Sequence, residues 1–137
     1  MLIADTSAWA RASDPLVRLD WAAALRAGQI ATCSIVTLEL LYSARNAQEL
    51  AVLESEQALL RDVPVTVSAQ RAAIGSLREL AARGAGQHRV PIADALIAAA
   101  AQDAGVDVLH YDRHYDRLAQ VLGFASVWIS PAGTLER

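Results

Sequence analysis

The 137-residue chain contains no lysine, one cysteine and no long apolar run. All 12 of its basic residues are arginine, whose guanidinium group binds phosphate through two parallel hydrogen bonds and stacks on bases. The absence of lysine therefore leaves RNA binding open. A genome whose base composition favours Arg and Ala codons would also explain it.

The single cysteine, Cys33, excludes an intrachain disulfide and a zinc site built from cysteines, and it fits a reducing compartment. The longest uncharged apolar stretch, residues 95–101, is far shorter than the ~20 residues of a membrane span. The first residues also lack the basic segment of a signal peptide. The sequence therefore predicts a cytoplasmic protein with no membrane segment.

The net charge of −3 argues against a surface that attracts nucleic acid over its whole area. The balance changes if four of the 15 acidic residues are metal ligands, because 11 acids then face 12 arginines. In that case attraction for RNA is local and comes from a few arginines and the metal.

Short apolar runs alternate with longer helical stretches, as in a parallel sheet covered by helices. We predict one three-layer, Rossmann-like α/β domain over residues 1–130, with a short central sheet of four to five parallel strands, and a loose tail over 131–137. The predicted strands span residues 2–4, 29–32, 63–67, 106–111 and 125–129. The predicted helices span residues 8–11, 15–27, 35–42, 47–60, 69–83, 91–105 and 113–122.

Capping residues mark several predicted helix starts. Asp14 is expected to cap a helix whose first residue is Pro15, and Ser34 and Ser68 are expected to cap two later helices. Pro64 has no N–H to donate to a sheet ladder, so its strand is expected at a sheet edge.

Two acidic residues follow predicted strands: Asp5 ends the first, and Asp112 follows the fourth. In open parallel sheets, ligands bind beyond the carboxyl ends of the strands, where the strand order reverses. If these two strands are neighbours, both carboxylates point into one crevice. Each acid also has a simpler interpretation, as a helix cap or as the start of a turn.

Two further acids stand in apolar helices. Glu39 lies in the apolar run 35–42, and Asp94 lies in a similar run at 90–97. Burying a carboxylate there is unfavourable unless it is paired or bound to metal. Alternatively, Glu39 lies on a solvent-facing side of its helix, and Asp94 complements the helix dipole. Together the four acids predict a shared cationic ligand.

Four motifs resemble those of PIN-domain ribonucleases, specifically the VapC-type toxins of bacterial toxin–antitoxin pairs. They are IADTSA at 3–8, VTLEL at 36–40, IADALIAAAA at 92–101 and HYDRHYDRL at 110–118. The resemblance extends from Leu2 to Ile129. It implies a PIN-like fold and Mg²⁺- or Mn²⁺-dependent cleavage of RNA that leaves a 5′-phosphate and a 3′-hydroxyl.

The resemblance also implies roles for single residues. The family's catalytic, metal-binding acids match Asp5, Glu39, Asp94 and Asp112. Thr6 or Ser7 matches the hydroxyl that supports the first acid. Oxygen ligands of this kind suit hard cations such as Mg²⁺ or Mn²⁺.

The fourth motif departs from the family pattern. His110 stands where the family often has Thr, and His114 where many members have a further acid. Asp116, one helical turn beyond Asp112, is expected to share or supplement its role as a metal ligand. Either histidine would help to bind substrate, although a loop histidine is more often a surface residue.

Arg89, Arg113 and Arg117 flank the motifs and are candidates for contacts to RNA phosphate. The alternative is that they are solvated or paired with neighbouring acids. The resemblance further implies a homodimer and a cognate antitoxin that also binds operator DNA. The apolar helices that would supply these surfaces contain Leu38, Leu41, Leu50, Leu53 and Leu60, although a plain core would explain the same residues.

Other functions fit parts of the pattern. Receiver domains and haloacid-dehalogenase-like phosphatases also place acids at strand ends, but both rely on a lysine that this chain lacks. The phosphatase pattern also needs a second acid where this chain has Ser7. A PIN-like module that binds RNA or protein without cleaving it is the other alternative, although such modules have lost their acids and here all four are present.

Overall fold

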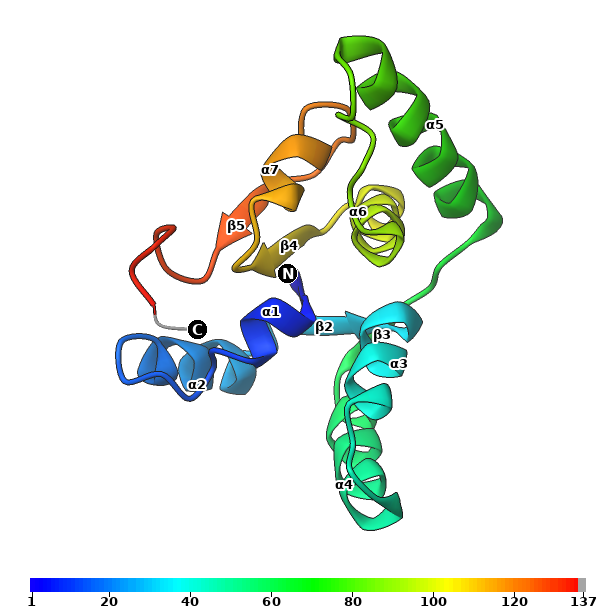
Figure 1. The fold of residues 1–137 in the computed structure, drawn as a ribbon. Helices are drawn as coiled ribbons and strands as arrows, with labels where there is room; N and C mark the ends of the chain where they lie inside the picture. Colours follow the sequence, from blue (N-terminus) through cyan, green and yellow to red (C-terminus); the bar gives the residue numbers. More distant parts are fainter. Residues whose placement is uncertain (136–137) are drawn as a thin grey trace.

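The computed structural model describes residues 1–135 and contains a five-stranded parallel sheet with helices on both faces (Figure 1). The strands are β1 (Leu2–Ala4), β2 (Ile30–Cys33), β3 (Arg61–Val63), β4 (Asp107–His110) and β5 (Ser126–Trp128). Their order across the sheet is β3-β2-β1-β4-β5, and every neighbouring pair is parallel. The predicted α/β fold with four to five parallel strands is confirmed.

The strand order reverses between β1 and β4. From β1 the chain adds β2 and then β3 on one side, and it returns to add β4 beside β1 on the other. Ala4 and Leu109 are partners in this register, so the ends of the two strands are level. The reversal makes a crevice beyond these ends, where open α/β sheets bind their ligands.

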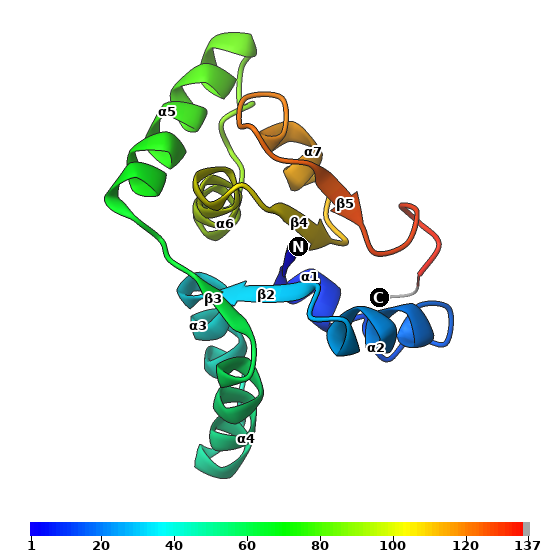
Figure 2. The same cartoon turned by 180° about the vertical axis from the view of Figure 1, so that it is seen from behind.

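The helices form the two outer layers. They are α1 (Thr6–Trp9), α2 (Arg18–Arg26), α3 (Ser34–Tyr42), α4 (Ala47–Ala58), α5 (Val67–Arg83), α6 (Ile92–Ala104) and α7 (His114–Leu118). In Figures 1 and 2, α5, α6 and α7 lie on one side of the sheet, α1 and α2 lie on the other, and α4 points away from it. Within residues 1–135, no helix combines the length and the apolar character that crossing a membrane requires.

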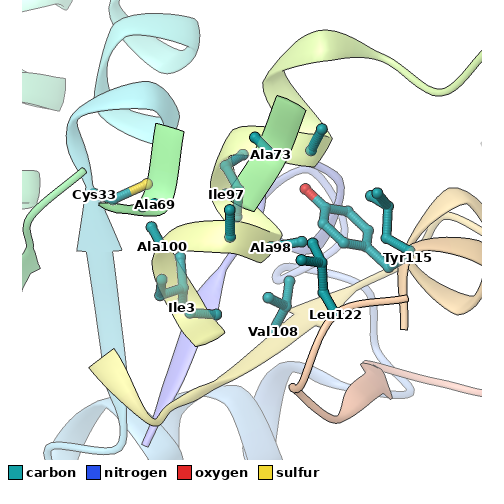
Figure 3. Close-up of a cluster of buried hydrophobic side chains, with 14 of the residues drawn as sticks. Ile3, Cys33, Ala69, Ala73, Ile97, Ala98, Ala100, Val108, Tyr115 and Leu122 are labelled. Carbon is teal, nitrogen blue, oxygen red and sulfur yellow. The ribbon is translucent and has the colours of Figure 1, made fainter. Parts of the chain in front are cut away.

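Two hydrophobic clusters hold the layers together, because successive side chains of a strand point to opposite faces. Ile3 and Val108 belong to the larger cluster, on the side of α6, with Ile97 and Tyr115 (Figure 3). Ala4 belongs to the smaller cluster, on the side of α1 and α2. The central strand is thereby fixed from both faces.

Helix α6 is the best-buried helix next to the crevice. Ile97 and all of residues 98–101, which are alanines, are fully buried. Their small side chains let α6 pack closely between the sheet and α5. The helix ends at Gly105, whose φ of 69° is the left-handed conformation common at helix ends. Because α6 is held along its length, the position of its first turn is fixed as well.

Two predicted helix starts are wrong. Helix α2 begins at Arg18, not at Pro15, because the Asp14 carboxylate caps a turn by accepting the Leu16 N–H at 2.9 Å. Helix α5 is capped by Thr66, whose hydroxyl accepts the Ala69 N–H at 3.0 Å.

Ser34 and Ser68, also predicted as caps, lie inside helices: Ser34 is the first residue of α3, and Ser68 belongs to α5. The N-cap of α3 is Cys33, which makes no side-chain capping bond. In both cases the helix begins one residue before the position expected from the polar residue or earlier, so that residue falls inside the helix.

The third strand lies at residues 61–63 and not at 63–67. It starts soon after α4 and pairs with β2 through Arg61 and Val63, while Pro64 follows its end. Its predicted position at a sheet edge is confirmed.

The segment after β5 was expected to be loose, but Leu135 is only 7% exposed. Its N–H donates to the Tyr111 hydroxyl at 2.9 Å. Leu135 therefore anchors the segment near the end of β4, while residues 131–134 are exposed; residues 136 and 137 lie outside the described residues.

Candidate metal centre

Asp5 is held at the end of β1 by the first turn of α1. Its Oδ2 accepts hydrogen bonds from the Ser7 N–H at 3.1 Å and from the Ser7 hydroxyl at 2.7 Å. Ser7 Oγ in turn accepts the Tyr111 N–H at 2.9 Å, so Ser7 joins the ends of β1 and β4. The hydroxyl that contacts Asp5 is therefore that of Ser7, while Thr6 lines the adjacent cavity.

Asp94 lies in the first turn of α6 and is 7% exposed. Its Oδ1 accepts a hydrogen bond from the Tyr115 hydroxyl at 3.3 Å. Burial raises the pKa of Asp94 to about 8, and repulsion by nearby carboxylates, chiefly Asp5, adds to the rise. Without a cation, most Asp94 carboxyl groups are therefore protonated at neutral pH.

Asp112 lies two residues beyond β4. Its N–H donates to His110 Nδ1 at 3.0 Å, and its Oδ1 accepts the His114 N–H, also at 3.0 Å. The ring nitrogen Nδ1 of His114 lies 2.7 Å from the same Oδ1 and 3.8 Å from Asp94 Oδ2. These three side chains each offer one ligand atom within 4.8 Å of the others.

Glu39 projects from α3 on its solvent-facing side, which was the alternative to a buried position. The apolar run suggested a buried helix, yet Val36 is its buried residue, and Leu38 and Tyr42 are 62% and 92% exposed. Helix α3 leads away from the sheet toward the projecting α4, so little of it reaches the core. Glu39 itself is exposed, and partial burial followed by repulsion from Asp5 raises its pKa.

The four acids predicted as ligands line one cavity of about 800 Å³ at the carboxyl edge of the sheet. The other polar residues of its wall are Thr6, Ser7, Ser43, Glu56 and Gln57. Glu56 was not predicted, because the sequence of α4 does not distinguish an acid that faces this cavity from its acidic neighbours. Tyr115 was also missed, since its contact with Asp94 depends on how α7 packs on α6.

Asp116 is not brought to this cavity. It is exposed on α7, and its carboxylate accepts the Ser126 hydroxyl at 2.6 Å and the Trp128 Nε1–H at 3.1 Å. It lines a second cavity, of about 700 Å³, which meets the first at Asp112. The prediction that Asp116 shares the role of Asp112 is not supported by this placement, because α7 turns its side chain toward β5.

His110 is neither a loop nor a surface residue, because it is the last residue of β4 and is fully buried. Its ring stacks on Tyr115 with centroids 4.8 Å apart. Nδ1 accepts the Asp112 N–H, so Nε2 carries the proton that faces Ser126 Oγ at 2.6 Å. Burial lowers the pKa of His110, which favours this neutral form. His110 therefore positions the loop of Asp112, and no ring nitrogen remains for substrate.

The three predicted RNA-binding arginines do not line the acidic cavity. Arg113 lines the second cavity, and Arg89 is exposed in the loop before α6. Arg117 reaches the same loop, where its Nη1 donates to the Gln87 carbonyl at 3.4 Å. Arg11 was not predicted, yet its guanidinium lies over a ring of the second cavity, 4.6 Å from the centroid of Tyr111.

The acidic cavity fits a divalent cation. Asp5 Oδ1 and Asp94 Oδ2 are buried, and neither has a hydrogen-bond partner among residues 1–135. Buried polar atoms in native proteins nearly always have partners, and clustered carboxylates repel one another. A hard cation would supply both the missing partner and the balancing charge.

Comparison with known proteins gives a consistent result. Residues 2–121 match the family model of the PIN domain. The chain is 46% identical to Ribonuclease VapC18 of Mycobacterium tuberculosis over 132 aligned residues. The alignment covers 96% of this chain and 96% of the relative. It is 41% identical over 132 residues to Ribonuclease VapC51 of the same organism, which covers 96% of this chain and 95% of the relative.

A solved structure has the same fold. The crystal structure of DNA-bound VapBC from Salmonella typhimurium superposes with a TM-score of 0.74 at 22% identity, covering 95% of this chain and 100% of that chain. The parallel sheet, the match over most of the chain and the two relatives agree. The chain therefore belongs to the PIN domain family, and within it to the VapC group that these relatives represent.

Proposed function

We propose that this chain is a metal-dependent endoribonuclease and the toxin of a toxin–antitoxin pair. The observation that carries the proposal is the cavity lined by Asp5, Glu39, Asp94 and Asp112, with two buried carboxylate oxygens that lack partners. Relatives that are 46% and 41% identical are named ribonucleases, which supports RNA as the substrate.

The four acids are proposed to hold Mg²⁺ or Mn²⁺. Such an ion, when bound, neutralises charge on a phosphodiester and lowers the pKa of water for attack. Ser7 holds Oδ2 of Asp5 and leaves Oδ1 available as a ligand. Tyr115 does the same for Asp94 by donating to Oδ1; burial raises the pKa of Tyr115, so its hydroxyl stays protonated and keeps donating.

Glu39 is the acid best placed to act on the attacking water. It stands on α3 and is more exposed than Asp5 or Asp94, so solvent reaches it. Its raised pKa brings its proton affinity closer to what a general base needs at neutral pH. We therefore propose that, within this set of four acids, Asp5 and Asp94 hold the metal most tightly and Glu39 also takes the proton from the attacking water.

The second cavity is the proposed path for RNA leaving the acidic cavity. The two meet at Asp112, and the second is lined by Arg11, Tyr111, Arg113 and Trp128. Arginine and aromatic side chains bind single-stranded RNA by contacting phosphate and stacking on bases. Arg89 and Arg117 lie around the loop before α6 and are proposed to extend this contact.

A homodimer and an antitoxin complex are also proposed, in the cytoplasm. The exposed apolar residues of α3 and of the α4 segment include Leu38, Tyr42, Val52 and Leu59, at 62%, 92%, 53% and 87% exposure. Large apolar side chains that are exposed on two neighbouring helices are typical of an interaction site. The VapBC structures that resemble this chain support an antitoxin partner. Size-exclusion chromatography of the chain alone, and of the chain co-expressed with the protein encoded upstream of it, tests the homodimer and the antitoxin complex. A monomer that does not bind the co-expressed protein contradicts both.

The deciding experiment for the activity is incubation of purified protein with a mixed RNA pool in Mn²⁺ or Mg²⁺. We expect cleavage by wild type, loss of cleavage in chelator, and no cleavage by Asp5→Asn or Asp94→Asn. Equal cleavage by wild type and both variants would contradict the proposal. RNA that is bound but left intact would favour the non-catalytic binding module.

A further inference from the structure

We propose that His114 is a direct nitrogen ligand of the metal in this site and that it makes the site prefer Mn²⁺ to Mg²⁺. This inference rests on the proposed metal-dependent function. It concerns a histidine whose ring nitrogen lies beside two of the proposed acidic ligands, Asp94 and Asp112.

The ring nitrogen Nδ1 of His114 has surroundings that suit a metal ligand. The atom is buried, and although Asp112 Oδ1 is 2.7 Å away, the two do not form a hydrogen bond with acceptable angles. Two electron-rich atoms at this distance are unfavourable unless a proton or a cation lies near both.

A second observation points the same way. Asp94 Oδ2 lies 3.8 Å from His114 Nδ1, belongs to a side chain that is more than nine-tenths buried, and has no partner among residues 1–135. Asp94, Asp112 and His114 thus offer two oxygens and one nitrogen within 4.8 Å of one another. Helix α7 begins at His114, so its first turn brings the ring from the side of the second cavity to Asp112.

The other histidines do not compete for this role. Both ring nitrogens of His110 are engaged, one with the Asp112 N–H and one with Ser126 Oγ. His88 is exposed in the loop before α6 and lines neither the acidic nor the second cavity. Since the chain has three histidines, any histidine nitrogen bound to a metal in the cavity is assigned to His114.

The choice of ion follows from ligand chemistry. Mg²⁺ is a hard ion that keeps oxygen ligands and several waters, whereas imidazole suits transition metals. A site with one nitrogen among its ligands should therefore discriminate against Mg²⁺ more than an all-oxygen site. Replacing His114 by the acid common in the family should restore Mg²⁺ binding relative to Mn²⁺.

The test is pulsed electron paramagnetic resonance of Mn²⁺ bound to tag-free full-length protein, which detects coupling to a directly bonded ¹⁴N nucleus. We expect this coupling in wild type and in the charge-matched control His88→Asp, and we expect it to be absent in His114→Asp. Calorimetric titration with each metal should show the ratio of Mg²⁺ to Mn²⁺ dissociation constants falling by about tenfold in His114→Asp.

Each contrary outcome has a distinct meaning. Bound Mn²⁺ without nitrogen coupling in wild type overturns the role of His114 and leaves the nuclease proposal standing; His114 would then only pair with Asp112. Coupling that survives in His114→Asp also overturns it. Failure of wild type to bind either metal contradicts both this inference and the proposed metal dependence. Because the wild-type spectrum is decisive, a folding defect in His114→Asp does not spoil the test.

Discussion

Asp94 and Asp116 both lie close to α7, yet their surroundings are opposite. Asp94 is buried, receives a hydrogen bond from Tyr115 on one oxygen only, and has its pKa raised to about 8. Asp116 is exposed, and its carboxylate accepts from Ser126 and from Trp128. Sequence alone made both candidates for the same role, and their partners now separate them.

The hydrogen-bond donors around each side chain distinguish a ligand-binding carboxylate from a structural one. The donors around Asp116 belong to the protein, so its charge is stabilised within the fold and joins α7 to β5. Asp94 has too few donors for its charge, so in the folded chain it needs a proton or a cation. A carboxylate whose charge a bound cation would stabilise is expected of a metal centre.

The largest effect should come from exchanging each acid for its amide. Asp94→Asn is expected to lower the initial rate of RNA cleavage at least ~100-fold, because it removes a charged ligand of the metal. Asp116→Asn is expected to change the rate less than about threefold, because Asp116 lies outside the acidic cavity and is not a proposed metal ligand. Equal losses in the two variants would abolish the distinction between them.

Without metal, the same two substitutions should change the free energy of unfolding in opposite directions: Asp94→Asn should raise it and Asp116→Asn should lower it. The folded pKa of Asp94, about 8, lies above the ordinary value of ~4 that applies in the unfolded chain. The folded protein therefore holds a proton that the unfolded chain releases, and the free energy of unfolding should fall as pH rises from ~4 to ~8.

Urea unfolding in chelator at pH 5 and pH 7 measures this effect. Asp94→Asn should remove most of the fall and be more stable than wild type by about 2–4 kcal/mol at pH 7. Asp116→Asn should be less stable than wild type by about 1 kcal/mol, since it weakens hydrogen bonds to β5. An Asp94→Asn protein less stable than wild type would show that the carboxylate is not strained in the folded state.

Removing the Ser7 hydroxyl should leave the Asp5 carboxylate with fewer hydrogen-bond donors. Ser7→Ala deletes the hydroxyl that donates to Asp5 and leaves the Tyr111 N–H without its acceptor. We expect about a tenfold loss of cleavage rate and a loss of about 1–2 kcal/mol of stability. Thr6→Ala, which deletes the neighbouring hydroxyl, is the matched control and should change either quantity little.

The smallest effect is expected in the second cavity, where charge is exposed. Arg113→Ala should raise the KM for RNA about threefold at low salt, with kcat unchanged, and the difference should shrink at high salt because exposed charges are screened. Arg26→Ala, at the exposed end of α2, is the control for a loss of charge elsewhere. A KM that responds equally to both changes would place the RNA path outside this cavity.

Much of this arrangement follows from local sequence. The apolar runs and their spacing predicted the parallel sheet, and the polar residues after them placed Asp5 and Asp112 at strand ends. Their proximity depends on β1 and β4 being neighbours, which is a property of strand order and could only be expected from general rules of topology.

Other features depend on contacts distant in sequence. The environment of Glu39 was predicted from apolar neighbours, but hydrophobic composition does not tell whether a helix faces the core or a partner. His110 is buried because Tyr115 and Trp128 cover its ring, and its Nε2–H donates to Ser126 Oγ; the local sequence does not indicate any of these contacts. The sequence predicted strand β4, but the burial of His110 at its end depends on tertiary packing.

The acidic metal centre is tested most directly by the anomalous difference map of crystals grown with Mn²⁺, recorded near the Mn absorption edge. We expect a peak in the acidic cavity about 2.0–2.4 Å from Asp5 Oδ1 and Asp94 Oδ2, the two buried oxygens that lack partners. Crystals of Asp94→Asn grown in the same way should lack this peak. A peak elsewhere, or full occupancy of the cavity in Asp94→Asn, would contradict the assignment of these carboxylates as the metal centre.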